Sequence, residues 1–186
     1  ILKHFSTASS PDNIFAALAQ FIEGLPASVQ IFSLLDHNRQ LTKLLCDMLI
    51  LSPQICDRLR RYPALFDLLL YRAFFAPIED TVTLKKMFLA KTDGLPVELA
   101  LDQIKILVRE LKFRAQVQTL SFATDIQTLQ SSLTAIAEAA IDRILSLARA
   151  DMVRRYGEIH VEIGIVALGR LGARQLTAGS DIDLLI

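Results

Sequence analysis

The chain has 186 residues, which is enough to bury a core in one or two domains. Its 20 Lys and Arg residues balance its 20 Asp and Glu residues, and the absence of a basic block removes the electrostatic attraction that supplies most nucleic-acid affinity. Hydrophobic residues make up 52% of the chain, but charged residues such as Asp67 and Arg72 interrupt every apolar stretch well before the ~20 residues of a membrane span.

Residues 1 to about 157 are predicted to be helical throughout. The first two helices are expected near residues 11–24 and 26–35, because Ser10 followed by Pro11 is typical of a helix start and apolar residues then recur at helical spacing. Helices of this length must pack together to be stable. The N-terminal part is therefore expected to form a helical bundle.

Three more short helices are predicted before Pro77. Asn38 can cap the first of them, Ser52-Pro53 is a typical start for the second, and Pro63 begins the third. The first carries an apolar stripe at helical spacing, formed by Leu41, Leu44, Leu45, Met48 and Leu49. With the two helices before them, these make five short helices.

Longer helices follow. One is predicted over residues 78–91, ended by Asp93-Gly94, and a second over 96–120. The second has an apolar stripe that is most simply core: Leu101, Ile104, Leu107, Val108, Leu111 and Val117. The last is expected between an N-cap at Asp125 and a C-cap at Gly157, about 45 Å long, as a strut between the bundle and the following segment.

Several cations lie along the two longest helices, namely Arg109, Lys112, Arg114, Arg143 and Arg149. These cations could form a wall that binds ATP phosphates or an acidic acceptor surface. Alternatively, they lie on ordinary solvated helix faces. Interspersed acidic residues favour the second.

The two cysteines, Cys46 and Cys56, lie ten residues apart without a metal-binding pattern. We expect two reduced core thiols in a cytoplasmic protein. His4, His37 and His160 are scattered, and no catalytic role is assigned to them.

A glycine turn follows an apolar run over residues 163–168, which is predicted to be a buried strand. Gly169 and Gly172 lie where this turn opens a short helix. Glycine allows the backbone to approach phosphate oxygens closely, and a helix N-terminus carries partial positive charge. Arg170 and Arg174 add full charges, so the turn is predicted to bind phosphate.

Asp181 and Asp183 follow Ser180 at the expected start of a second strand. Side chains two residues apart on a strand point to the same face, so both carboxylates would point to one place. Mg²⁺ typically takes one or two protein carboxylates and completes its shell with water and substrate phosphates. The pattern predicts a magnesium site and phosphoryl or nucleotidyl transfer.

The segments Ala-Leu-Gly-Arg-Leu-Gly at 167–172 and Ser-Asp-Ile-Asp-Leu at 180–184 resemble the nucleotidyltransferase superfamily that includes DNA polymerase beta. Within it, the chain is similar to the glutamine synthetase adenylyltransferase/deadenylylase family. More loosely, residues 21–35, 52–53 and 61–65 resemble the helical segment before the family's second catalytic domain, which carries adenylyl transfer. The chain departs from the usual family motif at Ala167, Arg170, Ala173 and Gln175.

The resemblance implies a mostly α fold, in which a helical bundle with a long strut helix precedes the truncated β-turn-β beginning of an α/β nucleotidyltransferase domain. We expect a helical subdomain at 1–95, long helices packing on the catalytic domain at 96–157, and the start of the nucleotidyltransferase domain at 158–186. Because the chain begins without Met and stops at Ile186 inside a strand, we expect a fragment that is inactive in isolation.

The resemblance also implies the reaction: transfer of AMP from ATP to a tyrosine of glutamine synthetase in the regulation of nitrogen assimilation. Asp181 and Asp183 would hold Mg²⁺ with a third carboxylate beyond the chain, and Gly169, Arg170, Gly172 and Ser180 would bind ATP. Glutamine synthetase and the PII signal protein are the expected protein partners, with no nucleic acid or membrane partner.

Two alternatives stay open. The same residues would serve the deadenylylating half of such an enzyme or a uridylyltransferase of the PII protein. Alternatively, the chain is a helical protein-interaction module without activity of its own, an interpretation that its high hydrophobic fraction supports.

Overall fold

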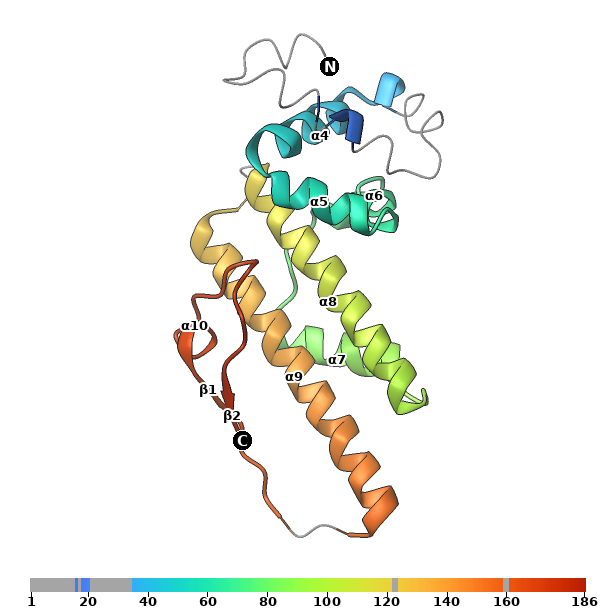
Figure 1. Ribbon diagram of the computed structural model, residues 1–186, viewed down its shortest axis with the longest axis vertical. Helices are drawn as coiled ribbons and strands as arrows, with labels where there is room; N and C mark the ends of the chain where they lie inside the picture. Colours follow the sequence, from blue (N-terminus) through green and yellow to red (C-terminus); the bar gives the residue numbers. More distant parts are fainter. Residues whose placement is uncertain (1–15, 17, 21–34, 122–123, 159–160) are drawn as a thin grey trace. The chain divides into compact units, whose positions relative to one another are not determined.

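The computed structural model describes residues 16, 18–20, 35–121, 124–158 and 161–186. The helices predicted over 11–24 and 26–35 therefore lie almost entirely outside the described residues. Helices make up most of the described chain, and a two-stranded antiparallel sheet lies near its end (Figure 1). The predicted fold class, mostly α with a β-turn-β segment last, is confirmed.

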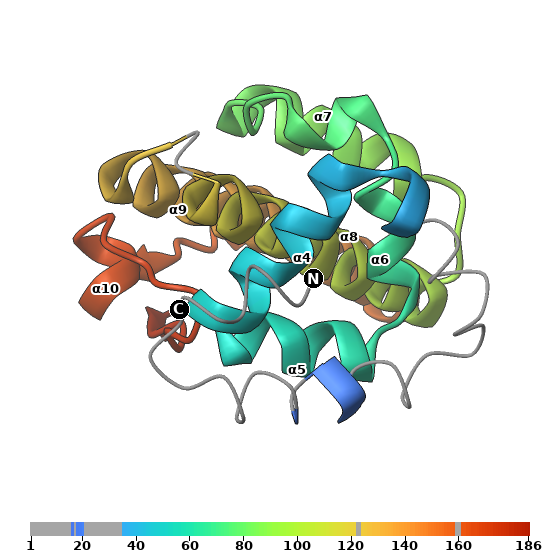
Figure 2. The same cartoon turned by 90° about the horizontal axis from the view of Figure 1, so that it is seen from above.

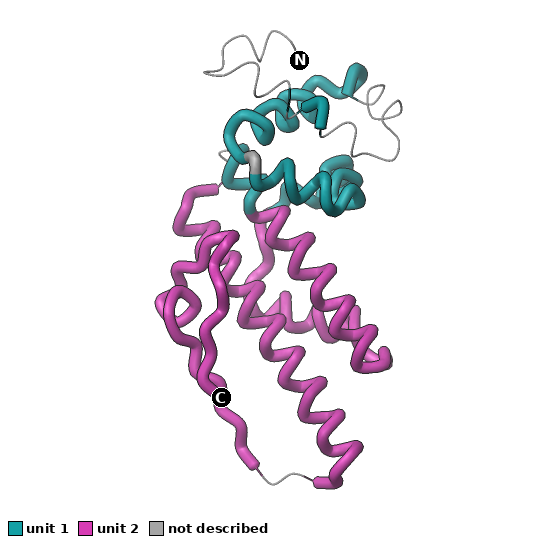
Figure 3. Tube along the Cα trace, viewed as in Figure 1, with its two compact units in different colours: residues 1–76, 116–123 teal, residues 77–115, 124–186 magenta. Residues whose placement is uncertain are grey.

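The chain forms two compact units (Figure 3). Unit 1 contains residues 1–76 and 116–123, and unit 2 contains 77–115 and 124–186. Helix α8 (Val97–Leu120) contributes residues to both. These units describe packing within the chain, whereas the functional division expected at 95/96 and 157/158 stays a prediction.

Between residues 38 and 76, unit 1 contains three of the predicted helices and one helix that was not predicted. In it, α4 (Arg39–Leu51) packs on α5 (Pro53–Arg61), and α5 packs on α6 (Ala64–Leu68) (Figure 2). The start signals are confirmed: Asn38 Oδ1 accepts a hydrogen bond from the Leu41 amide at 3.0 Å, and Pro53 is the first residue of α5. The Ser52 side chain makes no capping bond.

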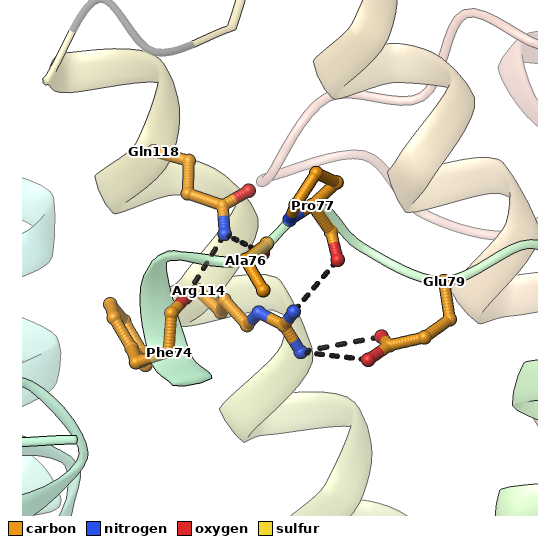
Figure 4. Close-up of polar contacts among 6 residues, drawn as sticks. All are labelled: Phe74, Ala76, Pro77, Glu79, Arg114 and Gln118. Atoms are coloured by element: carbon orange, nitrogen blue, oxygen red, sulfur yellow. Dashed lines mark hydrogen bonds and ion pairs between the residues drawn. The ribbon is translucent and has the colours of Figure 1, made fainter. Parts of the chain in front are cut away.

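The unpredicted element is a 3₁₀ helix, η1 (Arg72–Phe75). At four residues it is too short to show helical periodicity. The buried Gln118 amide group holds its end, donating to the carbonyl oxygens of Phe74 at 3.0 Å and Ala76 at 2.6 Å (Figure 4). Tertiary contacts therefore stabilise this turn.

Both thiols are free and buried in unit 1, as predicted. Burial disfavours the charged thiolate, so the pKa of Cys56 is raised to about 12 and that of Cys46 is also raised. Both shifts favour the neutral thiol, which is a weaker nucleophile than the thiolate.

Unit 2 is built on α7 (Thr81–Thr92), α8 and α9 (Ile126–Tyr156), with α7 and α9 packed side by side (Figures 1 and 2). The predicted limits of α9 are confirmed. Asp125 Oδ1 accepts from the Thr128 amide at 2.7 Å, and Gly157 ends the helix with φ +87°. The core contains Leu84, Phe88, Ile104, Leu107, Leu111, Ile136 and Leu147, which confirms the predicted stripe of α8 within this unit.

The predicted start of α7 at Ile78 is wrong, because the helix begins after Asp80. The Asp80 carboxylate accepts from the Thr83 amide at 2.7 Å, and the backbone before the helix is extended. Arg114 of α8 donates to the Pro77 carbonyl oxygen at 2.7 Å and to the Glu79 carboxylate at 3.3 Å (Figure 4). The first bond uses the Pro77 carbonyl oxygen, which would accept from Thr81 in a helix that began at Ile78, and the second holds the Glu79 side chain on α8.

Two of the five predicted surface cations have structural roles. Only 13% of the Arg114 side chain is exposed, so it does not belong to a solvated face. Arg143 Nε donates to the buried Thr92 Oγ1 at 2.6 Å, and its Nη2 donates to the Thr92 carbonyl oxygen at 3.3 Å. Arg143 thereby satisfies the C-terminal end of α7.

Among the helices that the structure describes, the apolar stretches fall short of what crossing a bilayer requires.

Candidate functional site

The predicted order of strand, glycine turn, short helix and strand is present in unit 2. Strand β1 (Val166–Ala167) pairs antiparallel with β2 (Leu184–Leu185), and Val166 lies opposite Leu185. The Leu168 amide extends the pairing by donating to the Asp183 carbonyl oxygen at 2.9 Å. Between the strands lies α10 (Gly169–Gly172), a single helical turn.

The prediction of a buried strand over 163–168 is wrong. The ladder is only two residues long, and Ile163, Val166 and Leu168 are 46%, 54% and 46% exposed. A strand is fully buried only when other elements cover both of its faces. Among the described residues from 161 to 186, only Leu171, Leu176 and the half-buried Leu184 pack into the hydrophobic core.

The turn brings Asp183 against Gly169. Gly169 has φ +52°, a conformation that costs other L-residues energy, and a Cβ atom there would lie 2.7 Å from Asp183 Oδ2. The carboxylate therefore occupies the space that a side chain would fill. Two residues that sequence analysis assigned to the same site are adjacent in space.

Gly172 permits the close packing of α10 on β1. A Cβ atom at Gly172 would collide with the carbonyl oxygen of Ala167, and the Gly172 amide donates to the Leu168 carbonyl oxygen at 3.0 Å. Its amide is thus used inside the turn. Ala173, where the family motif usually has glycine, has right-handed φ and ψ of −78° and −4°, so alanine is accommodated without strain.

A polar network closes the loop between α10 and the two aspartates. The Ser180 hydroxyl accepts from the Thr177 amide at 2.9 Å and lies 2.8 Å from Thr177 Oγ1. Arg170 Nη1 donates to Thr177 Oγ1 at 3.3 Å and to Ser180 Oγ at 3.4 Å. The guanidinium and both hydroxyls are therefore held together on the exposed side of the turn.

Thr177 was not singled out by sequence analysis, although its position is recognisable. It stands three residues before Ser180, with Gly179 between them, which is a typical composition for a turn closed by hydroxyl groups. Thr177 connects Arg170 to Ser180.

Arg174 points elsewhere than expected. It is the only described non-glycine residue with positive φ, +57°, and such a conformation costs roughly 1–3 kcal/mol. Its guanidinium Nη1 lies 3.1 Å from Glu138 Oε1, on α9. In the described structure, the Arg174 charge therefore faces the helix and not the predicted phosphate site.

Asp181 and Asp183 fit a magnesium site that takes few of its ligands from the protein. Both Asp181 and Asp183 are exposed, immediately before β2, and no cluster of three or more His, Cys, Asp or Glu residues occurs within the described ranges. Mg²⁺ characteristically binds one or two carboxylates together with water and phosphate oxygens. Two hard oxygen donors beside a glycine turn agree with that mode.

A sequence model of the glutamate-ammonia ligase adenylyltransferase family matches residues 42–186, from α4 to the end of β2. The chain belongs to this family. The match includes Gly169 and Gly172 of the glycine turn, and Asp181 and Asp183, which precede β2.

Three relatives illustrate the similarity. Each is named bifunctional glutamine synthetase adenylyltransferase/adenylyl-removing enzyme, and the alignments cover all of this chain. The protein from Brucella suis biovar 1 (strain 1330) is 31% identical over 188 residues, that from Mesorhizobium japonicum (strain LMG 29417 / CECT 9101 / MAFF 303099) is 32% identical, and that from Bartonella quintana (strain Toulouse) is 28% identical. The chain spans 19% of the length of these relatives.

Proposed function

We propose that this chain contributes to the transfer of AMP from ATP to a tyrosine of glutamine synthetase. The observation that carries the proposal is the contact between the Asp183 carboxylate and the glycine turn at Gly169, in a chain that belongs to an adenylyltransferase family. It joins a metal-binding group to a segment suited to phosphate. Adenylyl transfer requires both.

Asp181 and Asp183 would hold Mg²⁺. The bound ion would neutralise charge that develops on the phosphate and on the leaving pyrophosphate. The exposure of both carboxylates leaves room for water and substrate oxygens in the remaining coordination positions. Because Gly169 has no side chain, the Asp183 carboxylate lies against the turn, so a metal ion held there would be next to a triphosphate bound along the turn.

The triphosphate would bind along the turn that begins at Gly169. The amides of Gly169, Arg170 and Leu171 precede the bond that the Gly172 amide donates to Leu168, so they are the candidate donors to phosphate oxygens. Arg170 would add a guanidinium charge, which Thr177 and Ser180 hold in place. Gly172 would act by allowing the turn to form, since its own amide is used by Leu168.

The names of the relatives also favour a second candidate function. They describe both an adenylyltransferase and an adenylyl-removing enzyme, so the reverse process on adenylylated glutamine synthetase is the alternative. Family membership supports either activity over a uridylyltransferase of PII. We propose glutamine synthetase as substrate, PII as a regulatory partner and the cytoplasm as location.

The test measures whether the full-length protein, in the presence of Mg²⁺, transfers labelled AMP from α-labelled ATP to glutamine synthetase. We expect label on glutamine synthetase with the unmodified protein. The Asp181→Asn/Asp183→Asn double variant should lose at least about 100-fold in rate, because an amide replaces each anionic ligand of the metal. Its helical circular dichroism should be unchanged, because both side chains are exposed.

Either result decides a specific point. Substantial transfer by the double variant would exclude Asp181 and Asp183 as metal ligands. Removal of label from adenylylated glutamine synthetase, without transfer to the unmodified form, would assign the chain to the adenylyl-removing activity.

A further inference from the structure

The glycine turn is tied to α9 by an ion pair that spans 36 residues of sequence. Arg174 lies two residues after α10, and its Nη1 is 3.1 Å from Oε1 of Glu138. Glu138 lies in the middle of α9, a helix of 31 residues. The turn that carries the candidate site therefore has a directional contact with the longest rigid element of unit 2.

The carboxylate of Glu138 is itself held in place. Its second oxygen, Oε2, accepts a hydrogen bond from Thr81 Oγ1 at 3.2 Å, and Thr81 is the first residue of α7. The two oxygens thus have different partners, one on a neighbouring helix and one on the turn. An acceptor fixed in this way restricts the direction from which Arg174 can approach.

Apolar contacts hold the turn against the same part of the unit. Leu171 and Leu176 flank Arg174 and are 3% and 4% exposed, in a cluster with Leu133 and Ala137 of α9. Hydrophobic contacts of this kind have little directional preference. The leucines therefore hold the turn on α9 without fixing its orientation. The ion pair and the left-handed backbone at Arg174 fix that orientation.

We propose that Glu138 and Arg174 are positioning residues for the candidate site. By fixing the turn on α9, they would set the orientation of the turn that carries Gly169 and Arg170, while the pairing of β1 with β2 keeps Asp183 beside it. This inference rests on the proposed function for its effect on rate, but the link itself is testable without activity.

The pair contributes little to global stability. The Arg174 and Glu138 side chains are 61% and 35% exposed, and solvent weakens such ion pairs. Removing either partner should therefore leave the fold intact while changing the placement of the turn. Small displacements of this kind reduce the rate of the chemical step.

The experiment compares Glu138→Gln, Arg174→Gln, the double variant and the charge reversal Glu138→Arg/Arg174→Glu in the full-length protein. The matched control is Asp142→Asn, four residues along α9, where Asp142 pairs with Lys85 of α7 at 2.6 Å and does not touch the turn. Each protein is measured for kcat, for KM for ATP, for its thermal midpoint, and for amide hydrogen exchange over residues 169–183.

We expect each single variant to lower kcat about three- to tenfold, with KM for ATP changed by less than about twofold. The double variant should be no slower than the singles, and the charge reversal should recover part of the loss. Exchange over 169–183 should quicken in the singles at unchanged thermal midpoint. The control should match the unmodified protein in every measurement.

Additive losses in the double variant, or the same loss in the control, would overturn the proposal. A rise in KM for ATP with kcat unchanged would also overturn it, because Arg174 would then contact nucleotide directly. If the unmodified protein transferred no AMP, the proposed function would fail, and the exchange rates would still decide the link: unchanged exchange in the singles would exclude it.

Discussion

At the scale of single residues, two glycines of the candidate site differ in what a methyl group would meet. A Cβ atom at Gly172 would collide with the backbone of Ala167, whereas one at Gly179 has nothing within 4 Å. Backbone atoms cannot rotate away as a side chain can. The close approach of α10 to β1 therefore requires glycine at position 172 but not at 179.

The Gly172→Ala substitution should destabilise the turn by about 1–3 kcal/mol, since α10 must move away from β1. Gly179→Ala should change stability by less than about 0.5 kcal/mol, because the position is open. Amide hydrogen exchange of residues 169–183 measures both. Equal exchange rates in the two variants would contradict the close packing at Gly172.

At the scale of elements, α9 depends on the capping carboxylate of Asp125. The hydrogen bond from the Thr128 amide favours the charged form, so the pKa of Asp125 is lowered from its ordinary value of 3.8. A lowered pKa stabilises the folded chain at pH above 3.8. This stabilisation is lost as the pH falls through the lowered value.

Asp125→Ala should lower the thermal unfolding midpoint at pH 7 by about 2–4 °C, because the first turn of α9 loses its cap. Asp125→Asn keeps an acceptor oxygen and should lose less. Midpoints measured from pH 7 down to below the lowered pKa should converge for the unmodified and Asn proteins once the pH is under 3.8, as the Asp125 carboxylate is protonated. A difference that stays constant over this range would show that the charge of Asp125 has no role.

At the scale of the whole molecule, the chain spans 19% of its relatives' length, and its described residues offer two exposed candidate metal carboxylates, Asp181 and Asp183, just before β2. A Mg²⁺ site with only two protein carboxylates depends on water and substrate oxygens for its other ligands. The 186-residue chain alone should therefore bind Mg²⁺ weakly without nucleotide and transfer no AMP, whereas we expect the full-length protein to bind Mg²⁺ together with nucleotide and to transfer AMP.

Calorimetric titration with Mg²⁺, with and without a non-hydrolysable ATP analogue, tests this expectation beside the Asp181→Asn/Asp183→Asn variant. AMP transfer by the chain alone would show that no further carboxylate is needed. Binding of glutamine synthetase without binding of nucleotide would instead favour the interaction-module interpretation for this chain.

Features that depend on neighbouring residues were predictable from sequence. The caps at Asn38, Asp125 and Gly157 each involve groups within four residues of the helix end, and all three are present in the structure. The order of strand, glycine turn and second strand was predictable for the same reason. The start of α7 was not, because Arg114 holds the preceding segment extended from 35 residues away.

For the candidate site, the order of residues along the chain was enough to predict a glycine turn, an arginine and two aspartates, whose chemistry suits phosphate and Mg²⁺. The contact of Asp183 with Gly169 and the pairing of Arg174 with Glu138 are visible only in the folded chain. The same holds for the exposure of most of residues 163–168. The physical reason is that hydrogen-bonded turns and caps are closed by near neighbours, whereas burial and ion pairs depend on segments that only folding brings together.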